Sequence, residues 1–181
     1  MLALIAIWAL AEATLFFIVA DVPIMALGVK SGVKQALIGA CVAAVFAAIG
    51  GSILYTYSIY NWKEVWEIML SVPGIDEELT REVLRAWDEQ GPLAMVWGSF
   101  SGVPYKLYAW AAADAWSHWI WLPAFFLASI LARLPRFILV AVVAGWIGPR
   151  MIERFGKRRV WIAFVLGWSG FYALYWSAVG L

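Results

Sequence analysis

The chain lacks most of what a metalloprotein or a soluble enzyme needs. It has one cysteine, Cys41, and one histidine, His118, in 181 residues, which excludes an internal disulfide and a histidine-rich metal site. It contains no GxGxxG, P-loop or HExxH motif. No basic segment precedes the first apolar run, as it would in a cleavable signal peptide. The sequence therefore predicts no metal, no cofactor and no enzymatic activity.

Charge is also scarce, at 14% of the residues with a net charge of +1, so no nucleic-acid-binding surface is expected. Hydrophobic residues make up 65% of the chain and thirteen are tryptophan, whereas soluble domains have roughly 45–50% apolar residues. A soluble domain of this length needs more polar residues to cover its surface. Disorder and a coiled coil are excluded by the same composition. The sequence predicts one all-α integral membrane domain, residues 1–181.

Uncharged runs predict where the chain crosses the membrane, because a spanning helix needs about 20 apolar residues. Residues 35–62 and 160–181 carry no charge, and each is long enough for one span. Residues 63–91 are different, since the stretch 63–90 holds eight acids and three bases. Within this segment, the stretch 71–87 predicts an amphipathic helix that lies at the membrane surface or on the protein, because Pro73 and Gly74 precede a helical apolar stripe.

The distribution of charge predicts the orientation. Lys30, Lys34 and the segment 150–159, with five basic residues and one acid, belong in the cytoplasm by the positive-inside rule. One span at 35–62 then places the acidic segment outside. The chain must return between 92 and 148, a stretch too long for one helix and short for three.

Two re-entrant hairpins satisfy these lengths. The first covers 1–29 and breaks near Ala20–Pro23, because a straight helix of that length would reach about 42 Å across a hydrocarbon core of about 30 Å. The second covers 92–117, breaks at Gly102-Val103-Pro104, and is followed by a span at 119–148. The chain then contains two inverted repeats of hairpin plus span and a final C-terminal span, which is typical of transporters.

Six ionisable side chains lie inside the apolar stretches, and their charges sum to zero. Each would cost about 2.5–3.5 kcal/mol or more if it faced lipid, so we expect them to be paired or to face a wet cavity. They either lock the hairpins together or handle a charged substrate, and intramembrane charge favours the second interpretation. The six are Glu12, Asp21, Lys106, Asp114, Arg133 and Arg136.

Arg133 and Arg136 are at positions i and i+3, which puts them on one helix face, although Pro135 disfavours a regular helix there. Two guanidinium groups on one face suit a phosphate. They would equally pair with two acids, so both a phosphate clamp and a salt-bridge lock stay open.

Lys106 and Asp114 are two helical turns apart, which predicts a common face. Lys106 either points into this cavity or extends to the membrane interface. Asp114 either pairs with Lys106 or caps the turn before Trp116. His118 lies among tryptophans, as in an interfacial aromatic belt.

Three stretches resemble the DedA/VTT family, also called SNARE-associated Golgi proteins, and in particular its bacterial YqaA-like branch. AEATLFFIVADVPIMALGV (11–29) is similar to the first re-entrant element of that family. GSFSGVPYKLYAWAAADAW (98–116) and ASILARLPRFILVAVVAGWIG (128–148) are similar to its second half, which has a proline turn followed by an arginine-bearing span.

The sequence departs from the family pattern at several positions, and these departures bear on substrate identity more than on fold. Ala20 stands where the family has proline before its second acid, and the family's small helix usually has a glycine near Ala113, beside which this chain has Asp114. Ser101 and Lys106 stand where the turn usually carries arginines.

The resemblance implies a lipid flippase or scramblase for a lipid phosphate, such as undecaprenyl phosphate or a phospholipid, with proton coupling in some members. It assigns the acids of the first hairpin to Glu12 and Asp21, and the basic residues of the second half to Lys106, Arg133 and Arg136. Membrane lipids and protons are then the expected partners, the bacterial inner membrane is the expected location, and homo-oligomerisation stays open. The alternative is a structural or assembly protein whose buried charge pairs lock the hairpins.

Overall fold

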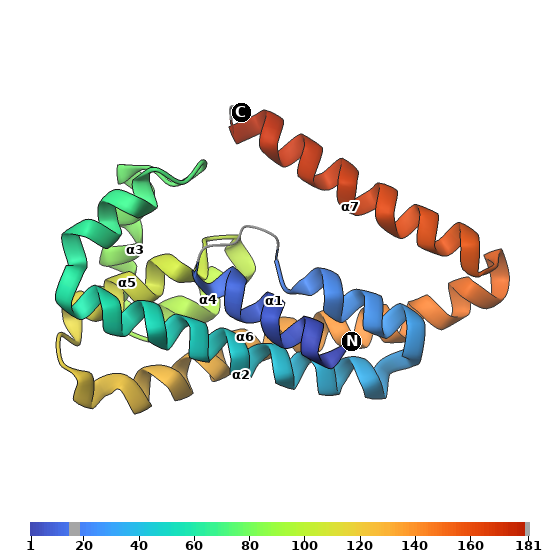
Figure 1. Cartoon of the computed structure of the whole chain (residues 1–181), viewed down its shortest axis with the longest axis horizontal. Helices are drawn as coiled ribbons and strands as arrows, with labels where there is room; N and C mark the ends of the chain where they lie inside the picture. Colours follow the sequence, from blue (N-terminus) through green and yellow to red (C-terminus); the bar gives the residue numbers. More distant parts are fainter. Residues whose placement is uncertain (15–18, 180–181) are drawn as a thin grey trace.

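The computed structural model describes residues 1–14 and 19–179, and every regular element in these ranges is a helix (Figure 1). The predicted all-α class is therefore confirmed for this part of the chain. The elements are α1 (Leu2–Thr14), α2 (Asp21–Leu70), α3 (Glu77–Gln90), α4 (Leu93–Ser101), α5 (Tyr105–Ala115), the short 3₁₀ helix η1 (Trp119–Trp121), α6 (Leu122–Phe155) and α7 (Lys157–Val179).

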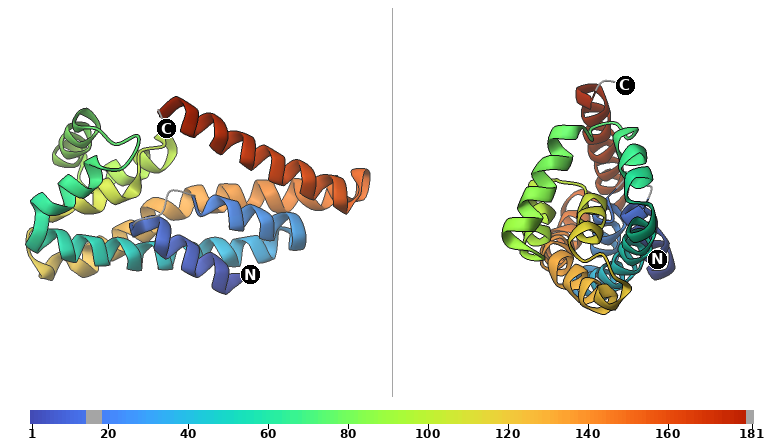
Figure 2. Two further views of the ribbon diagram at one scale, coloured as in Figure 1. Left: turned by 45° about the horizontal axis from the view of Figure 1, so that its top comes forward. Right: turned by 90° about the vertical axis from the view of Figure 1, so that its left-hand side faces the viewer.

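The range of α2 consists of three helical segments that meet at two bends. Gly32 adopts φ 79° and ψ −179°, and Asn61 adopts φ −135° and ψ 40°, so the helix divides into the segments 21–31, 33–60 and 62–70. The first bend requires a positive φ, which glycine adopts without steric penalty. It reverses the chain, so that 21–31 and 33–60 lie side by side (Figures 1 and 2). The predicted span 35–62 corresponds to the segment 33–60.

Helices α2 and α6 make the most extensive contact in the described structure, and small residues allow their close approach. A Cβ added at Gly145 would lie 2.5 Å from the Cα of Val33, and one at Gly148 would lie 2.5 Å from the Cα of Val29. A Cβ at Gly28 would meet the backbone nitrogen of Gly145 at 2.8 Å. The glycines therefore hold the Gly32 bend against the C-terminal half of α6.

Several helix boundaries in the structure differ from the predicted ones. The first break was predicted near Ala20–Pro23; α2 begins at Asp21 with Ala20 as its N-cap, so Pro23 lies inside the helix, and residues 15–18 lie outside the described part of the chain. The predicted break at 102–104 is confirmed, because α4 ends at Ser101 and α5 begins at Tyr105. The predicted amphipathic helix is α3, which starts after the N-cap Asp76, whereas residues 63–70 continue α2.

Pro135 was expected to disfavour a regular helix, but it does not interrupt α6. Pro135 and Pro149 both lie inside α6, which continues to Phe155 instead of ending at 148. Proline removes one backbone hydrogen bond, but tertiary packing along α2 holds the helix together on both sides of Pro135, as in many membrane helices.

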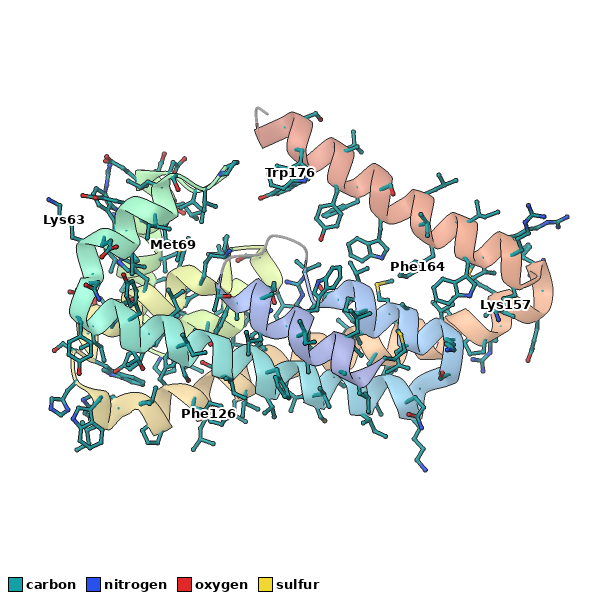
Figure 3. The ribbon with its side chains drawn as sticks, in the orientation of Figure 1. Lys63, Met69, Phe126, Lys157, Phe164 and Trp176 are labelled. Atoms are coloured by element: carbon teal, nitrogen blue, oxygen red, sulfur yellow. The ribbon has the colours of Figure 1, made fainter. Side chains whose placement is uncertain are left out.

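Three helices are long and apolar enough to cross a membrane: α2, α6 together with η1, and α7. The chain is therefore an integral membrane protein. Its acidic and basic segments lie at opposite ends of the long helices, as the labels on Lys63 and Lys157 show in Figure 3. Helix α7 leaves the end of α6 at an angle and passes back over the bundle (Figures 1 and 2).

Candidate functional site

Two ion pairs join α6 to the N-terminal elements. Arg133 donates from Nη2 to Oε2 of Glu12 on α1 at 2.6 Å, and Arg136 pairs with Asp21 at the start of α2. The arginines are separated by one helical turn, which places them on one side of α6. The structure thus brings together four of the six charged residues that the sequence selects, and it pairs each acid with a particular arginine.

Arg136 lies between two helix ends. It donates from Nε to Oδ2 of Asp21 at 3.1 Å, and from Nη1 to the backbone carbonyl of Ser99 at 2.6 Å. Ser99 is in the last turn of α4, where carbonyl groups lack partners within the helix, and Asp21 is the first residue of α2. A cation at a helix C-terminus and an acid at a helix N-terminus both suit the helix dipoles.

Arg133 is more enclosed. Its guanidinium carbon lies 4.6 Å from the ring centroid of Tyr105 and 5.0 Å from that of Phe137, which is cation–π distance. Tyr105 donates from its hydroxyl to Oγ of Ser129 at 2.7 Å, which fixes the ring. Only 7% of Arg133 is exposed, yet its Nη1 has no hydrogen-bond partner among the described residues. A buried donor in this state is costly and marks where a further acceptor would fit.

A cavity of about 590 Å³ lies against these arginines, within the range of small-molecule sites. Glu12, Lys106, Arg133 and Arg136 line it, together with the 102–104 turn. Lys106 is 4% exposed, so it does not extend to the membrane interface.

The prediction that Asp114 belongs to the charged site is wrong. It is exposed near the C-terminus of α5 and does not line the cavity, whereas Lys106 on the same helix is buried. Eight residues rotate a 3.6-residue helix about 80° beyond two full turns, which is enough to separate the two faces. Lys106, Arg133 and Arg136 therefore line the cavity together with Glu12, and Asp114 is not among its charged residues.

Helix α7, which was predicted only as a membrane span, forms the opposite wall of the cavity. Its lining residues are Ala163, Phe164, Gly167, Trp168, Phe171, Tyr172 and Tyr175. The aromatic members are spaced at i, i+4, i+7, i+8 and i+11, a pattern that identifies one helix face and was available from the sequence. Ser99, Tyr105 and Phe137 left no comparable signal, because their roles arise from contacts between distant segments.

A hydrogen bond connects α7 to the rest of the site. The backbone N–H of Val19 donates to the hydroxyl of Tyr172 at 3.0 Å. Helix α7 is largely exposed, with 6% of its apolar window buried. The cavity therefore lies between a packed, charged wall and a lightly attached aromatic helix.

The chain is similar to a protein from Haemophilus influenzae that is described as uncharacterized. The two sequences are 31% identical over 162 residues, which cover 87% of this chain and 77% of the relative. No family model and no solved structure matches the chain. Because the similarity extends over most of both sequences, the chain belongs to the same family as this Haemophilus influenzae protein.

Proposed function

We propose that the protein is a lipid translocase of the DedA/VTT type, a flippase or scramblase that moves a lipid phosphate between leaflets. The observation that carries the proposal is the cationic wall of the cavity, which Lys106, Arg133 and Arg136 line. A phosphate is a fitting occupant, since each guanidinium can donate two parallel hydrogen bonds to it. Neutralising the headgroup lowers the cost of taking it through the hydrocarbon core.

The ion pairs provide a way to release the headgroup. In the structure the carboxylates of Glu12 and Asp21 accept hydrogen bonds from Arg133 and Arg136. An arriving phosphate would compete with these carboxylates for the same N–H groups. Oδ1 of Asp21 is buried and has no hydrogen-bond partner among the described residues. A proton on Asp21 would weaken its attraction for Arg136 and leave that arginine to the phosphate, which supports proton coupling as part of the proposal.

The proposal includes the membrane arrangement. The helix pairs α1 with 21–31, and α4 with α5, are the two re-entrant hairpins of an inverted repeat. The Gly32 bend packs beside Gly145 and Gly148, so Lys30 and Lys34 lie near the basic segment 150–159 at one end. This supports a cytoplasmic position for that end. A bacterial inner membrane is the proposed location, in line with the Haemophilus relative.

The test uses the purified full-length protein in liposomes that carry a labelled polyprenyl phosphate or labelled phospholipids. An impermeant quencher then reports how fast inner-leaflet label reaches the outer leaflet. We expect Arg136→Ala to abolish movement of one lipid class, while Arg154→Ala, which removes an exposed charge on the same helix, leaves it unchanged. Equal transport per folded molecule in both variants would overturn the proposal.

A structural role is the second candidate, because both arginines already have acidic partners in the structure. In that case the ion pairs only hold α1 and α2 against α6. The pairing found here sets the test, since Glu12 faces Arg133 and not Arg136. Reversing the charges within each pair should then restore function as well as folding.

A further inference from the structure

The cavity has two chemically different walls. The wall formed by α1, α4, α5 and α6 carries the charged groups described above. The wall formed by α7 carries aromatic rings and the small residues Ala163 and Gly167, and its only polar side-chain groups are tyrosine hydroxyls and the indole nitrogen of Trp168. A ligand that fills this space must be anionic on one side and apolar on the other.

The α7 wall is a helix face, not a scatter of side chains. With 100° per residue, Phe164, Trp168 and Phe171 fall within about 60° of one another. Figure 3 shows Phe164 and Trp176 projecting from α7 toward the bundle. Ile162 and Leu166 lie on the opposite side of the helix and are exposed, whereas Phe164 and Trp168 are half-buried. The helix thus presents one aromatic face to the cavity and one aliphatic face to the surrounding lipid.

Gly167 leaves room on the cavity side. A Cβ built at Gly167 meets no atom within 4 Å, although the residue lines the cavity. Phe164 and Phe171 flank it along this face, so the glycine produces a gap between two rings. A gap of this kind accommodates a slender chain that lies against the helix.

We propose that the α7 wall binds a hydrocarbon chain of the anionic lipid whose phosphate meets Arg133 and Arg136, with the chain passing at Gly167. This inference rests on the proposed function for the identity of the headgroup. Two observations support a lipid chain as the occupant: the apolar lining of the wall and its continuity with the cationic wall in a single cavity. The chain would remain in an apolar environment throughout headgroup transfer, which avoids exposing its methylene groups to water.

The experiment uses a phosphatidic acid with a diazirine in its acyl chain, mixed into phosphatidylcholine liposomes that contain the full-length protein. After irradiation, mass spectrometry maps the labelled residues. We expect more labelling at Phe164 and Trp168 than at Ile162 and Leu166, which contact bulk lipid. A diacylglycerol with the same chain should lack this preference, since it has no phosphate for the arginines.

Two glycines on α7 give a matched pair of variants. Gly167→Leu places a side chain in the cavity, and we expect roughly tenfold less labelling of Phe164 and Trp168, as for one misfitting group in an apolar pocket. Gly170→Leu adds the same side chain one turn away, where a Cβ also meets nothing within 4 Å, and it should change nothing. Both substitutions raise helix propensity, so a general effect on α7 would appear in both.

The outcomes separate this inference from the proposed function. Uniform labelling around α7, or labelling that Gly167→Leu leaves unchanged, overturns the chain-binding wall even if Arg136→Ala abolishes transport. Selective labelling that Gly167→Leu removes supports the wall even if no lipid crosses the bilayer, and in that case the translocase proposal fails instead.

Discussion

Arg136 and Asp21, 115 residues apart in the sequence, form an ion pair in which two guanidinium nitrogens donate to the same carboxylate oxygen. The second carboxylate oxygen, Oδ1, has no hydrogen-bond partner among the described residues. The pair therefore joins the start of α2 to the middle of α6 and still leaves acceptor capacity unused. Its neighbour, Arg133 with Glu12, leaves a donor unused instead.

Charge reversal within the Asp21–Arg136 pair distinguishes a purely structural role of the ion pair from a phosphate-binding role. Breaking a buried pair costs about 3–5 kcal/mol, so Asp21→Arg and Arg136→Asp should each lower the melting temperature in detergent. We expect the double variant to recover much of that loss but not lipid transport, because the arginine then lies on a different element from the phosphate site. Recovery of transport together with stability would favour the structural role.

The exposed pair of Glu77 and Arg81 on α3 provides the control. Surface pairs contribute about 0–1 kcal/mol. Reversal of this pair should therefore leave both melting temperature and transport close to those of the wild type.

Replacing an acid by its amide should strengthen headgroup binding. In Asp21→Asn the arginine loses its charged competitor, so we expect the stabilisation by added lipid phosphate to increase by about 1.4 kcal/mol, a tenfold change in affinity. Transport should become slower, since release now lacks the competing carboxylate. Thermal shifts with and without lipid phosphate measure the effect, and Glu153→Gln at the exposed end of α6 is the control. Unchanged or weaker lipid stabilisation would contradict the competition between acid and phosphate.

The sequence predicts the described fold well where composition and periodicity decide it. The charge-free run at 35–62 and the Gly102–Pro104 break both correspond to observed features. Intramembrane charge also selected residues that meet, because an apolar environment makes isolated charges costly. The bends at Gly32 and Asn61 could not be assigned, since isolated glycine and asparagine residues occur in many straight helices.

The ion pairs that particular acids and arginines form could not be predicted from the sequence. The sequence did not show which of Glu12 and Asp21 pairs with which arginine. Rules such as the i, i+4 spacing relate residues within one helix, and these acids lie more than 100 residues from Arg133 and Arg136. Asp114 was misplaced because a separation of eight residues drifts around a helix by enough to change its environment. The role of α7 was missed because its aromatic residues resemble an ordinary lipid-facing span until the cavity beside it is known.

The topology can be tested with single cysteines in a Cys41→Ser background. Lys63→Cys lies at the acidic end of the long helices and Lys157→Cys at the basic end (Figure 3). An impermeant maleimide applied to intact spheroplasts should label the first variant and should label the second only after permeabilisation. The reverse pattern would contradict the positive-inside assignment.

Close packing of α2 on α6 should be sensitive to a single methyl group. Gly145→Ala places a Cβ 2.5 Å from backbone atoms of Val33, which cannot move independently of the helix. We expect a loss of about 1–3 kcal/mol from overpacking, measured as a lower melting temperature. Gly170→Ala, where the space is open, should gain about 0.5–1 kcal/mol from helix propensity. Equal effects at the two positions would contradict the packing.

The hydrogen bond between Tyr172 and Val19 should control how closely α7 lies to the bundle. Tyr172→Phe removes the acceptor of the Val19 N–H, a loss of about 0.5–1.5 kcal/mol. Because α7 has few other packed contacts, this is enough to favour positions in which the helix swings away. Spin labels at Leu174 on α7 and Trp97 on α4, which are 73% and 68% exposed, should report a longer and broader distance distribution. Tyr175→Phe removes a hydroxyl from the same wall and should leave the distribution unchanged. If α7 gates entry to the cavity, Tyr172→Phe should also accelerate lipid capture, whereas an unchanged distance distribution would mean that α6 alone positions the helix.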